Sequence, residues 1–288
     1  MNANQNNMTI TTPRPFSELV SQSSRDRDSL VCVGLDPDLS RMPDSIVSGR
    51  SAGEAIVAFN KQVIDATAEF AAIYKPNLAF YVQYGVAGFE ALLRTRALIP
   101  DGTPVILDCK IGDISTTMEP FARAYLDDAG FDAITVNPYL GSESLAPLFS
   151  RAGKGLFLLC KNSNPGSGEI QNLELATGRP LFAEIAAKVV EWNQTAEATL
   201  GLVAGATYPA ELLTIREVAP RLLILVPGIG SQAGDLATAL DAGLDSNGGG
   251  LLINSSRSIT YASTGADFAT AAGTAAKSLR DQINAVRG

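Results

Sequence analysis

Residues 105–113 read VILDCKIGD, an apolar run that leads directly into an Asp-x-Lys-x-x-Asp series. The first residues of this run are typical of a buried strand. Because side chains alternate along a strand, Asp108 and Lys110 should project to one side, about 7 Å apart at Cα. Asp113 follows the strand end, where a loop can turn it back toward them. Two carboxylates around one ammonium are suited to proton transfer, so the sequence predicts such a site at this strand end.

Seven more short apolar runs occur along the chain, and helical periodicity separates them. Apolar residues recur with helical spacing between residues 56 and 70, and again between residues 268 and 286. Strands that alternate with helices form parallel sheets, and eight such units predict an α/β protein with the (β/α)8 TIM barrel fold. A doubly wound open sheet is the main alternative. The expected strands are residues 30–34, 72–75, 105–108, 133–136, 155–159, 202–204, 223–226 and 251–253.

Length and composition fit a single barrel. The chain has 288 residues, 46% of them hydrophobic, and no Pro/Ser-rich linker divides it. We expect a flexible polar arm over residues 1–14 and one catalytic barrel domain over residues 15–288. The arm lacks the apolar core of a signal peptide, and no later run is long enough to span a membrane. The net charge of −8, without a Lys/Arg run, argues against nucleic-acid binding. A cytoplasmic protein is expected.

The absence of histidine removes several chemistries. With no histidine in the chain, Ser-His and Cys-His nucleophile pairs and His-ligated zinc are excluded. Any acid/base catalysis must therefore use Lys, Asp or Glu. The cysteines, Cys32, Cys109 and Cys160, have no CxxC spacing and are expected to be reduced core thiols. Cys109 should lie on the face opposite Asp108 and Lys110.

Polar side chains follow the predicted strands at their carboxyl ends, where a barrel places its active site. Any one of them could serve only as a turn or cap residue, but their repetition at every strand favours a site. Glycine amides at Gly228 and Gly230, with Arg257 after the last strand, predict a phosphate site. Residues 161–178 are either a mobile lid or a solvated loop. The strand-end residues are Asp36, Lys75, Asp108, Lys110, Asn137, Ser163, Thr207, Gln232 and Arg257.

Six strand-end motifs, taken in chain order, form a specific set. They are Gly34-Leu35-Asp36, Lys75-Pro76-Asn77, Asp108-x-Lys110-x-x-Asp113, Ser163-Asn164-Pro165-Gly166, Pro227-Gly228-Ile229-Gly230 and Ser256-Arg257-Ser258-Ile259. From about residue 30 to residue 263, the chain resembles the orotidine 5′-phosphate decarboxylase family in its longer bacterial form. The resemblance implies decarboxylation of orotidine 5′-phosphate to UMP without cofactor or metal, as the last step of de novo pyrimidine biosynthesis. It also implies a homodimer with sites shared across the interface.

The same resemblance assigns roles to the residues of the charged series. Lys110 would protonate C6 of the pyrimidine and stabilise the carbanion that forms as carbon dioxide leaves. Asp108 would position Lys110 close to the substrate carboxylate. Asp113 and a following threonine would reach the ribose of the neighbouring subunit. Spacing favours Thr117 for this contact, with Thr116 as the alternative.

Substrate-binding residues are implied in the same way. Asp36 and Lys75 resemble contacts to the ribose and to the charge network. Ser163 would bond the pyrimidine amide, and Pro165 would pack against the base. The phosphate would be held by Gly228, Gly230, Gln232 and Arg257. Ser256 stands where the family's short form has glycine.

Three other functions fit parts of the sequence. A related phosphosugar barrel, such as a 3-keto-gulonate 6-phosphate decarboxylase or a hexulose phosphate synthase, would use the acidic positions to hold Mg²⁺. A Schiff-base aldolase could use Lys110, although its reactive form is uncharged and neighbouring carboxylates favour the charged form. A non-catalytic nucleotide-binding barrel is the third.

Overall fold

Eight parallel strands alternate with helices in the computed structural model, which describes residues 13–228 and 233–288. The hydrogen-bonded order is β2-β1-β8-β7-β6-β5-β4-β3. Bridges from Tyr74 to Val105 and from Asn77 to Asp108 join β2 to β3 and complete the ring. The predicted (β/α)8 barrel is confirmed. The strands are β1 (Val31–Leu35), β2 (Ile73–Pro76), β3 (Ile106–Ile111), β4 (Ala133–Val136), β5 (Gly155–Lys161), β6 (Thr199–Ala204), β7 (Leu223–Val226) and β8 (Leu251–Ser255).

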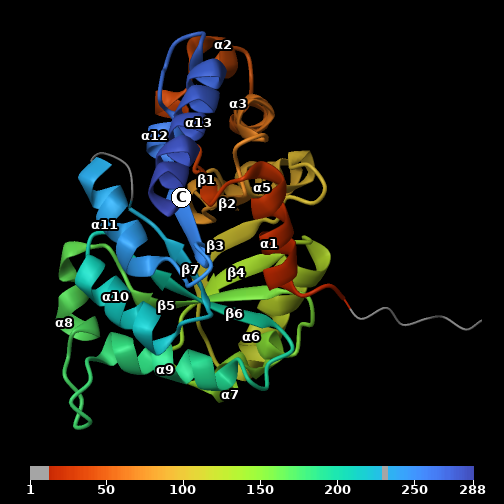
Figure 1. The fold of residues 1–288 in the computed structure, drawn as a ribbon. Coiled ribbons are helices and arrows are strands. Elements are labelled where there is room, and N and C mark those ends of the chain that lie inside the picture. Colours follow the sequence, from red (N-terminus) through yellow and green to blue (C-terminus); the bar gives the residue numbers. More distant parts are fainter. Residues whose placement is uncertain (1–12, 229–232) are drawn as a thin grey trace, which may run out of the picture.

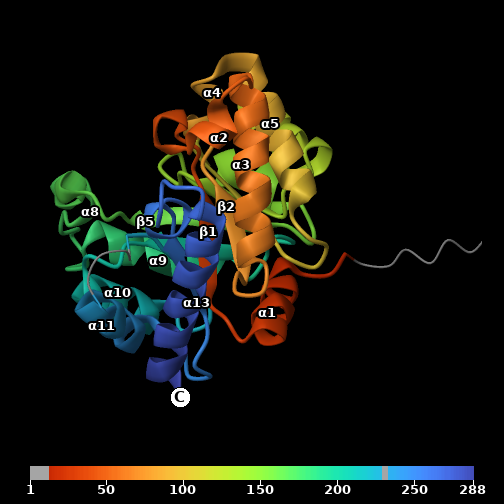
Figure 2. The same cartoon turned by 90° about the horizontal axis from the view of Figure 1, so that it is seen from above.

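Helices surround the strands on the outside, as the two views in Figures 1 and 2 show. The expected periodicity near residue 56 belongs to α3, where a Ser51–Glu54 capping box fixes the first turn. The α-helices are α1 (Phe16–Arg27), α2 (Asp44–Val47), α3 (Ala52–Thr67), α4 (Ala79–Val82), α5 (Gly85–Leu98), α6 (Ser115–Ala122), α7 (Ser142–Phe149), α8 (Gly168–Gln171), α9 (Leu181–Trp192), α10 (Pro209–Val218), α11 (Ala233–Gly243), α12 (Arg257–Thr260) and α13 (Phe268–Arg287).

Apolar side chains form two layers, one inside the barrel and one between the strands and the helices. The inner layer includes Cys32, Ile106 and Phe157, and α1 adds Phe16 and Val20 to it. The Phe16 ring meets the Phe157 ring edge-on, with the centroids 5.9 Å apart. Helix α1 therefore closes the amino-terminal end of the barrel, and the carboxyl ends of the strands are left for the site.

The cysteines lie where the sequence predicts. All three are free thiols, and Cys32 and Cys160 are buried. Cys109 is partly buried and packs against the outer apolar layer, and it also borders a pocket that Asp108 and Lys110 line. No helix among the described residues is long and apolar enough to cross a membrane. Because residues 1–12 lie outside the described residues, the polar arm stays a prediction.

Candidate active site

Strand β3 departs from regular geometry where its charged residues lie. Leu107 pairs with Ile134 of β4, two residues before Val136 in that strand. Ile111, four residues after Leu107, pairs with Val136. Two extra residues of β3 therefore bulge between these pairs, and Lys110 takes a left-handed φ of 46°. The predicted strand end at residue 108 is thus the start of a bulge, which re-aims the Lys110 side chain.

The hydroxyl of Thr135 fills the gap that the bulge leaves in the ladder. Thr135 is buried in β4, and its Oγ1 accepts hydrogen bonds from the backbone N–H groups of Cys109 (3.0 Å) and Lys110 (2.9 Å). The same hydroxyl donates to Asp108 Oδ1 at 2.9 Å. A hydroxyl offers one donor and two acceptor positions, so all of its capacity is used here. Sequence reasoning missed Thr135; its only signal is a lone threonine within an apolar strand.

One carboxylate lies between two ammonium groups. Asp108 Oδ2 accepts from Lys75 Nζ at 3.0 Å, and Oδ1 accepts from Lys110 Nζ at 2.5 Å. The Lys75 side chain is 4% exposed, whereas that of Lys110 is 45% exposed. Asn77 Nδ2 lies 3.5 Å from Asp108 Oδ2, and the Asn77 N–H donates to Asp36 Oδ1 at 3.2 Å. The predicted convergence of Asp36, Lys75, Asp108 and Lys110 is therefore present.

The two lysines set the ionisation of this carboxylate. Burial alone would raise the pKa of Asp108, but the charges of Lys75 and Lys110 outweigh it and lower the pKa to about 2. Burial likewise opposes the charged form of Lys75, yet Asp108 and Asp36 raise the pKa of its ammonium above the ordinary value. Both groups are ionised at neutral pH. Only Lys110 presents much of its charge to the barrel mouth.

Asp113 does not join this network within the protomer. Its carboxylate is exposed and accepts the N–H of Ile114 at 2.7 Å. Among the described residues, no ion pair connects it to a lysine. The sequence-based picture of two carboxylates around Lys110 is thus corrected, because the loop turns Asp113 outward. Thr116 is exposed and Thr117 half-buried, both in the first turn of α6.

The loops after β5, β6 and β7 meet at Ser163. Gly205 leaves the space for it, because a Cβ at that position would come 2.7 Å from Ser163 Cβ. Gly228 has a φ of 95°, and a Cβ there would lie 3.5 Å from the same atom. Pro165 is exposed at the start of a short 3-10 turn. Ser163, the expected contact to the pyrimidine amide, therefore lies beside the first glycine of the expected phosphate loop.

Arg257 follows β8, the strand between β7 and β1. Its side chain is exposed at the start of α12, and no ion pair engages it among the described residues. Ser256 lies directly over β1, where a Cβ on Gly34 would come within 2.6 Å of Ser256 Cβ. Glycine at position 34 thus makes room for the serine. Gly230 and Gln232 lie outside the described residues, so their predicted phosphate contacts stay predictions.

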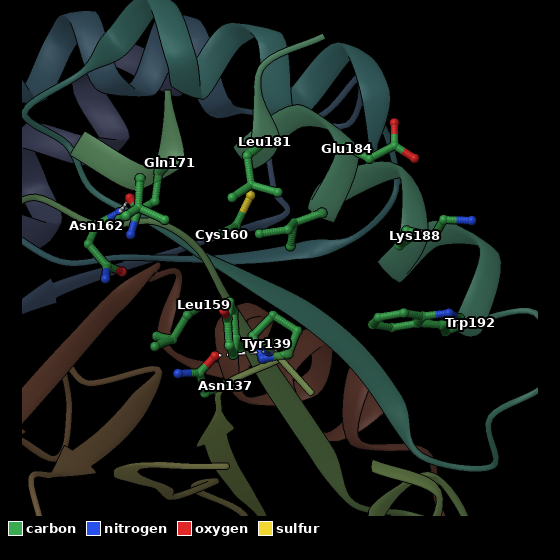
Figure 3. A pocket seen from close by; sticks show the side chains of 13 residues that line it. Asn137, Tyr139, Leu159, Cys160, Asn162, Gln171, Leu181, Glu184, Lys188 and Trp192 are labelled. Carbon is green, nitrogen blue, oxygen red and sulfur yellow. Dashed lines mark hydrogen bonds between the residues drawn. The ribbon is translucent and has the colours of Figure 1, made fainter. Parts of the chain in front are cut away.

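Apart from the barrel mouth, a cavity of about 540 Å³ lies outside the barrel, between the loops after β4 and β5 and helix α9 (Figure 3). It is called the second cavity below. Its wall is mainly apolar, with Leu159, Ile170 and Trp192 among its residues. Glu184 and Lys188 are its charged lining residues. In the part of the chain that the structure describes, no group of three or more Cys, Asp or Glu side chains could hold a metal ion.

Known proteins resemble this chain in sequence and in fold. The family model for "Orotidine 5'-phosphate decarboxylase / HUMPS family" matches residues 29–272. Orotidine 5'-phosphate decarboxylase of Thermomicrobium roseum is 49% identical over 273 residues, which cover 94% of this chain and 96% of the relative. The structure of Leishmania donovani OMP decarboxylase is similar with a TM-score of 0.82 at 38% identity, covering 95% of this chain and 99% of that one. A putative orotidine-monophosphate-decarboxylase from Toxoplasma gondii gives a TM-score of 0.86 at 36% identity, with 95% and 96% covered. The chain therefore belongs to the orotidine 5′-phosphate decarboxylase / HUMPS family.

Proposed function

We propose that this protein is a carboxy-lyase that converts orotidine 5′-phosphate to UMP and carbon dioxide in the cytoplasm, without a cofactor. The reaction is the last step of de novo pyrimidine biosynthesis. The observation that carries the proposal is the placement of Lys110: its ammonium is half-exposed at the barrel mouth and fixed by a buried carboxylate. Relatives of nearly equal length carry the name of this activity.

The chemical step needs one proton and a stabilised carbanion. The bond between C6 and the carboxylate carbon breaks, carbon dioxide leaves, and the electron pair stays on C6. Lys110 Nζ donates its proton to C6, and water later restores the proton. A fixed ammonium stabilises charge that develops only in the transition state, which lowers the barrier more than it strengthens substrate binding.

Three neighbours hold Lys110 ready for this step. Asp108 contacts the ammonium directly, Lys75 balances the charge of Asp108, and Thr135 fixes the backbone of the bulge. Because Asp108 is one carboxylate between two ammonium groups, the triplet carries a net positive charge toward an anionic substrate. Asp36 borders the same network through Asn77 and is proposed to contact the ribose.

The proposed binding groups come from other strand ends than Lys110 does. Ser163 and Pro165 are proposed to contact the pyrimidine, and Gly228, with Gly230 and Gln232 beyond it, to hold the phosphate. Arg257 is proposed as the cationic partner of the phosphate, which its exposed guanidinium supports. Binding energy gained at the phosphate can orient the base over Lys110.

We also propose a homodimer in which Asp113 and Thr117 reach the partner's ribose. The loops after β2, β3 and β4 are neighbours in the barrel and expose a group of large apolar side chains. Such a group is typical of an interaction surface, and Asp113 lies next to it in the sequence. Its members are Val82, Val86, Ile114, Tyr139 and Leu140.

The function is tested by the loss of orotidine 5′-phosphate absorbance with purified protein and excess chelator. We expect the wild type to turn over, Lys110→Ala to lose nearly all activity, and the control Lys154→Ala to keep it. Lys154 lies at the opposite end of the barrel and bonds the Phe131 carbonyl at 2.9 Å. No turnover by the wild type would refute the substrate, and an absolute need for Mg²⁺ would refute the cofactor-free reaction.

A further inference from the structure

A second buried lysine, Lys161, plays no part in the charge network described above. It is the last residue of β5, two residues before Ser163, and it is only 1% exposed. No carboxylate of the described residues forms an ion pair with it, unlike Lys75 with Asp108. Burying an ammonium without a counter-charge is costly, so its presence calls for a specific function.

Two groups take the place of the missing carboxylate. Lys161 Nζ donates a hydrogen bond of 2.8 Å to the Oγ of Ser167, which is itself buried. The ammonium also lies 4.4 Å from the centroid of the Tyr208 ring, a cation–π contact with the loop after β6. Lys161 thus ties the loop after its own strand to the loop after the next one.

The segment held in this way has little apolar support. Within this segment, residues 162–171, Ile170 is more than half exposed, and Ile170 and Gln171 form part of the wall of the second cavity. A further hydrogen bond joins the two ends of the segment, where the Asn162 N–H donates to Gln171 Oε1 at 2.8 Å (Figure 3). Hydrogen bonds and the cation–π contact, rather than apolar packing, therefore determine where this segment lies.

We propose that Lys161 is a positioning residue for pyrimidine binding. Through Ser167 and Tyr208 it fixes residues 162–171, and with them Ser163 and Pro165, over the barrel mouth. The inference rests on the proposed function, because it takes these two residues as the pyrimidine contacts. It assigns Lys161 no contact with the substrate and no role in proton transfer.

The test compares Lys161→Met with Lys154→Met. Lys154 directly precedes β5 and Lys161 ends it, and the ammonium of each donates a hydrogen bond to an oxygen outside the strand. Binding of UMP and of ribose 5-phosphate is measured by calorimetry, since only UMP carries the base. We expect Lys161→Met to lower the affinity for UMP about tenfold and the affinity for ribose 5-phosphate less than twofold. Lys154→Met should leave both affinities unchanged. Equal weakening of both ligands, or an unchanged UMP affinity, would overturn the proposal.

A second measurement does not depend on the substrate. Amide hydrogen exchange of residues 162–171 should quicken in Lys161→Met and stay at the wild-type rate in Lys154→Met. If Lys161→Met fails to fold, Ser167→Ala removes the hydrogen-bond acceptor alone and should give the same pattern to a smaller degree. Unchanged exchange rates in the folded variants would refute the claim that Lys161 holds residues 162–171 in place. Failure of the wild type to decarboxylate orotidine 5′-phosphate would instead refute the proposed function and leave the exchange result standing.

Discussion

Thr135 donates a hydrogen bond of 2.9 Å to the carboxylate of Asp108, and its oxygen also receives the backbone N–H of Lys110. A single hydroxyl thus fixes both the carboxylate and the backbone of the residue proposed to donate the proton. The left-handed backbone of Lys110 is unfavourable for a residue with a side chain. The hydroxyl offsets this cost, because it satisfies two amides that the bulge removes from the ladder.

Replacing Thr135 by valine should therefore impair catalysis more than substrate binding. Thr135→Val keeps the shape and leaves two partly buried amides unpaired, at a cost of about 2 kcal/mol in the free energy of unfolding. We expect kcat to fall about 10- to 100-fold with little change in KM, because Lys110 is displaced. Thr135→Ser keeps the hydroxyl and should recover most of the rate. Steady-state kinetics of the two variants checks this, and a serine variant as slow as the valine variant would contradict it.

The contact between Gly34 and Ser256 predicts a steric coupling. A Cβ at position 34 would come 1.8 Å from Ser256 Oγ but 3.0 Å from Ser256 Cα. Gly34→Ala should therefore displace the start of α12 and raise KM for orotidine 5′-phosphate about tenfold, because Arg257 moves with it. Removing the serine side chain in Gly34→Ala/Ser256→Gly should restore most of the affinity. A double variant no better than the single one would show that the effect does not pass through Ser256.

The ion pair between Lys75 and Asp108 predicts that wild type and Asp108→Asn differ in stability by an amount that depends on pH. Asp108→Asn leaves the buried Lys75 ammonium unpaired, so the free energy of unfolding at pH 7 should fall by about 3 kcal/mol. In the wild type, the pKa of Asp108 is about 2 when folded, against an ordinary value of 3.8. The carboxylate therefore stabilises the fold fully above about pH 4.5, and this contribution is lost as the pH falls toward 2.

Urea unfolding of both proteins measures this difference. The gap in stability between wild type and Asp108→Asn should be constant from pH 7 to about pH 4.5 and shrink below pH 4. A gap that stays constant down to pH 3 would mean that Asp108 does not ionise with a lowered pKa. Asp132→Asn is a matched control, because burial raises the pKa of Asp132 despite the nearby charge of Arg96. Its contribution has the opposite sign.

The barrel was predictable because its signals are local and repeated. Each strand is a short apolar run, and each is followed by polar residues that the topology must gather at one end. The convergence of Lys75, Asp108 and Lys110 followed from that rule. The bulge did not, because a period of two assumes regular pairing, and only the hydroxyl of Thr135 in the next strand stabilises the irregular form. Lys161 begins a segment that the sequence predicts to be either a mobile lid or a solvated loop. Its burial could not be predicted, because it depends on Tyr208, far along the chain.

The outward position of Asp113 predicts that two inactive variants can complement each other. If Asp113 serves the partner's site and Lys110 its own, a mixed dimer of Lys110→Ala and Asp113→Ala chains has one site with both changes and one site with neither. Random mixing gives roughly half mixed dimers, so about one quarter of the wild-type activity should return. The measurement is orotidine 5′-phosphate turnover after co-expression of differently tagged chains, with each variant alone as a control. Lys110→Ala mixed with Asp108→Ala should stay inactive, because both residues act within one protomer. Recovery in that control, or none with Asp113→Ala, would contradict a site shared across the interface.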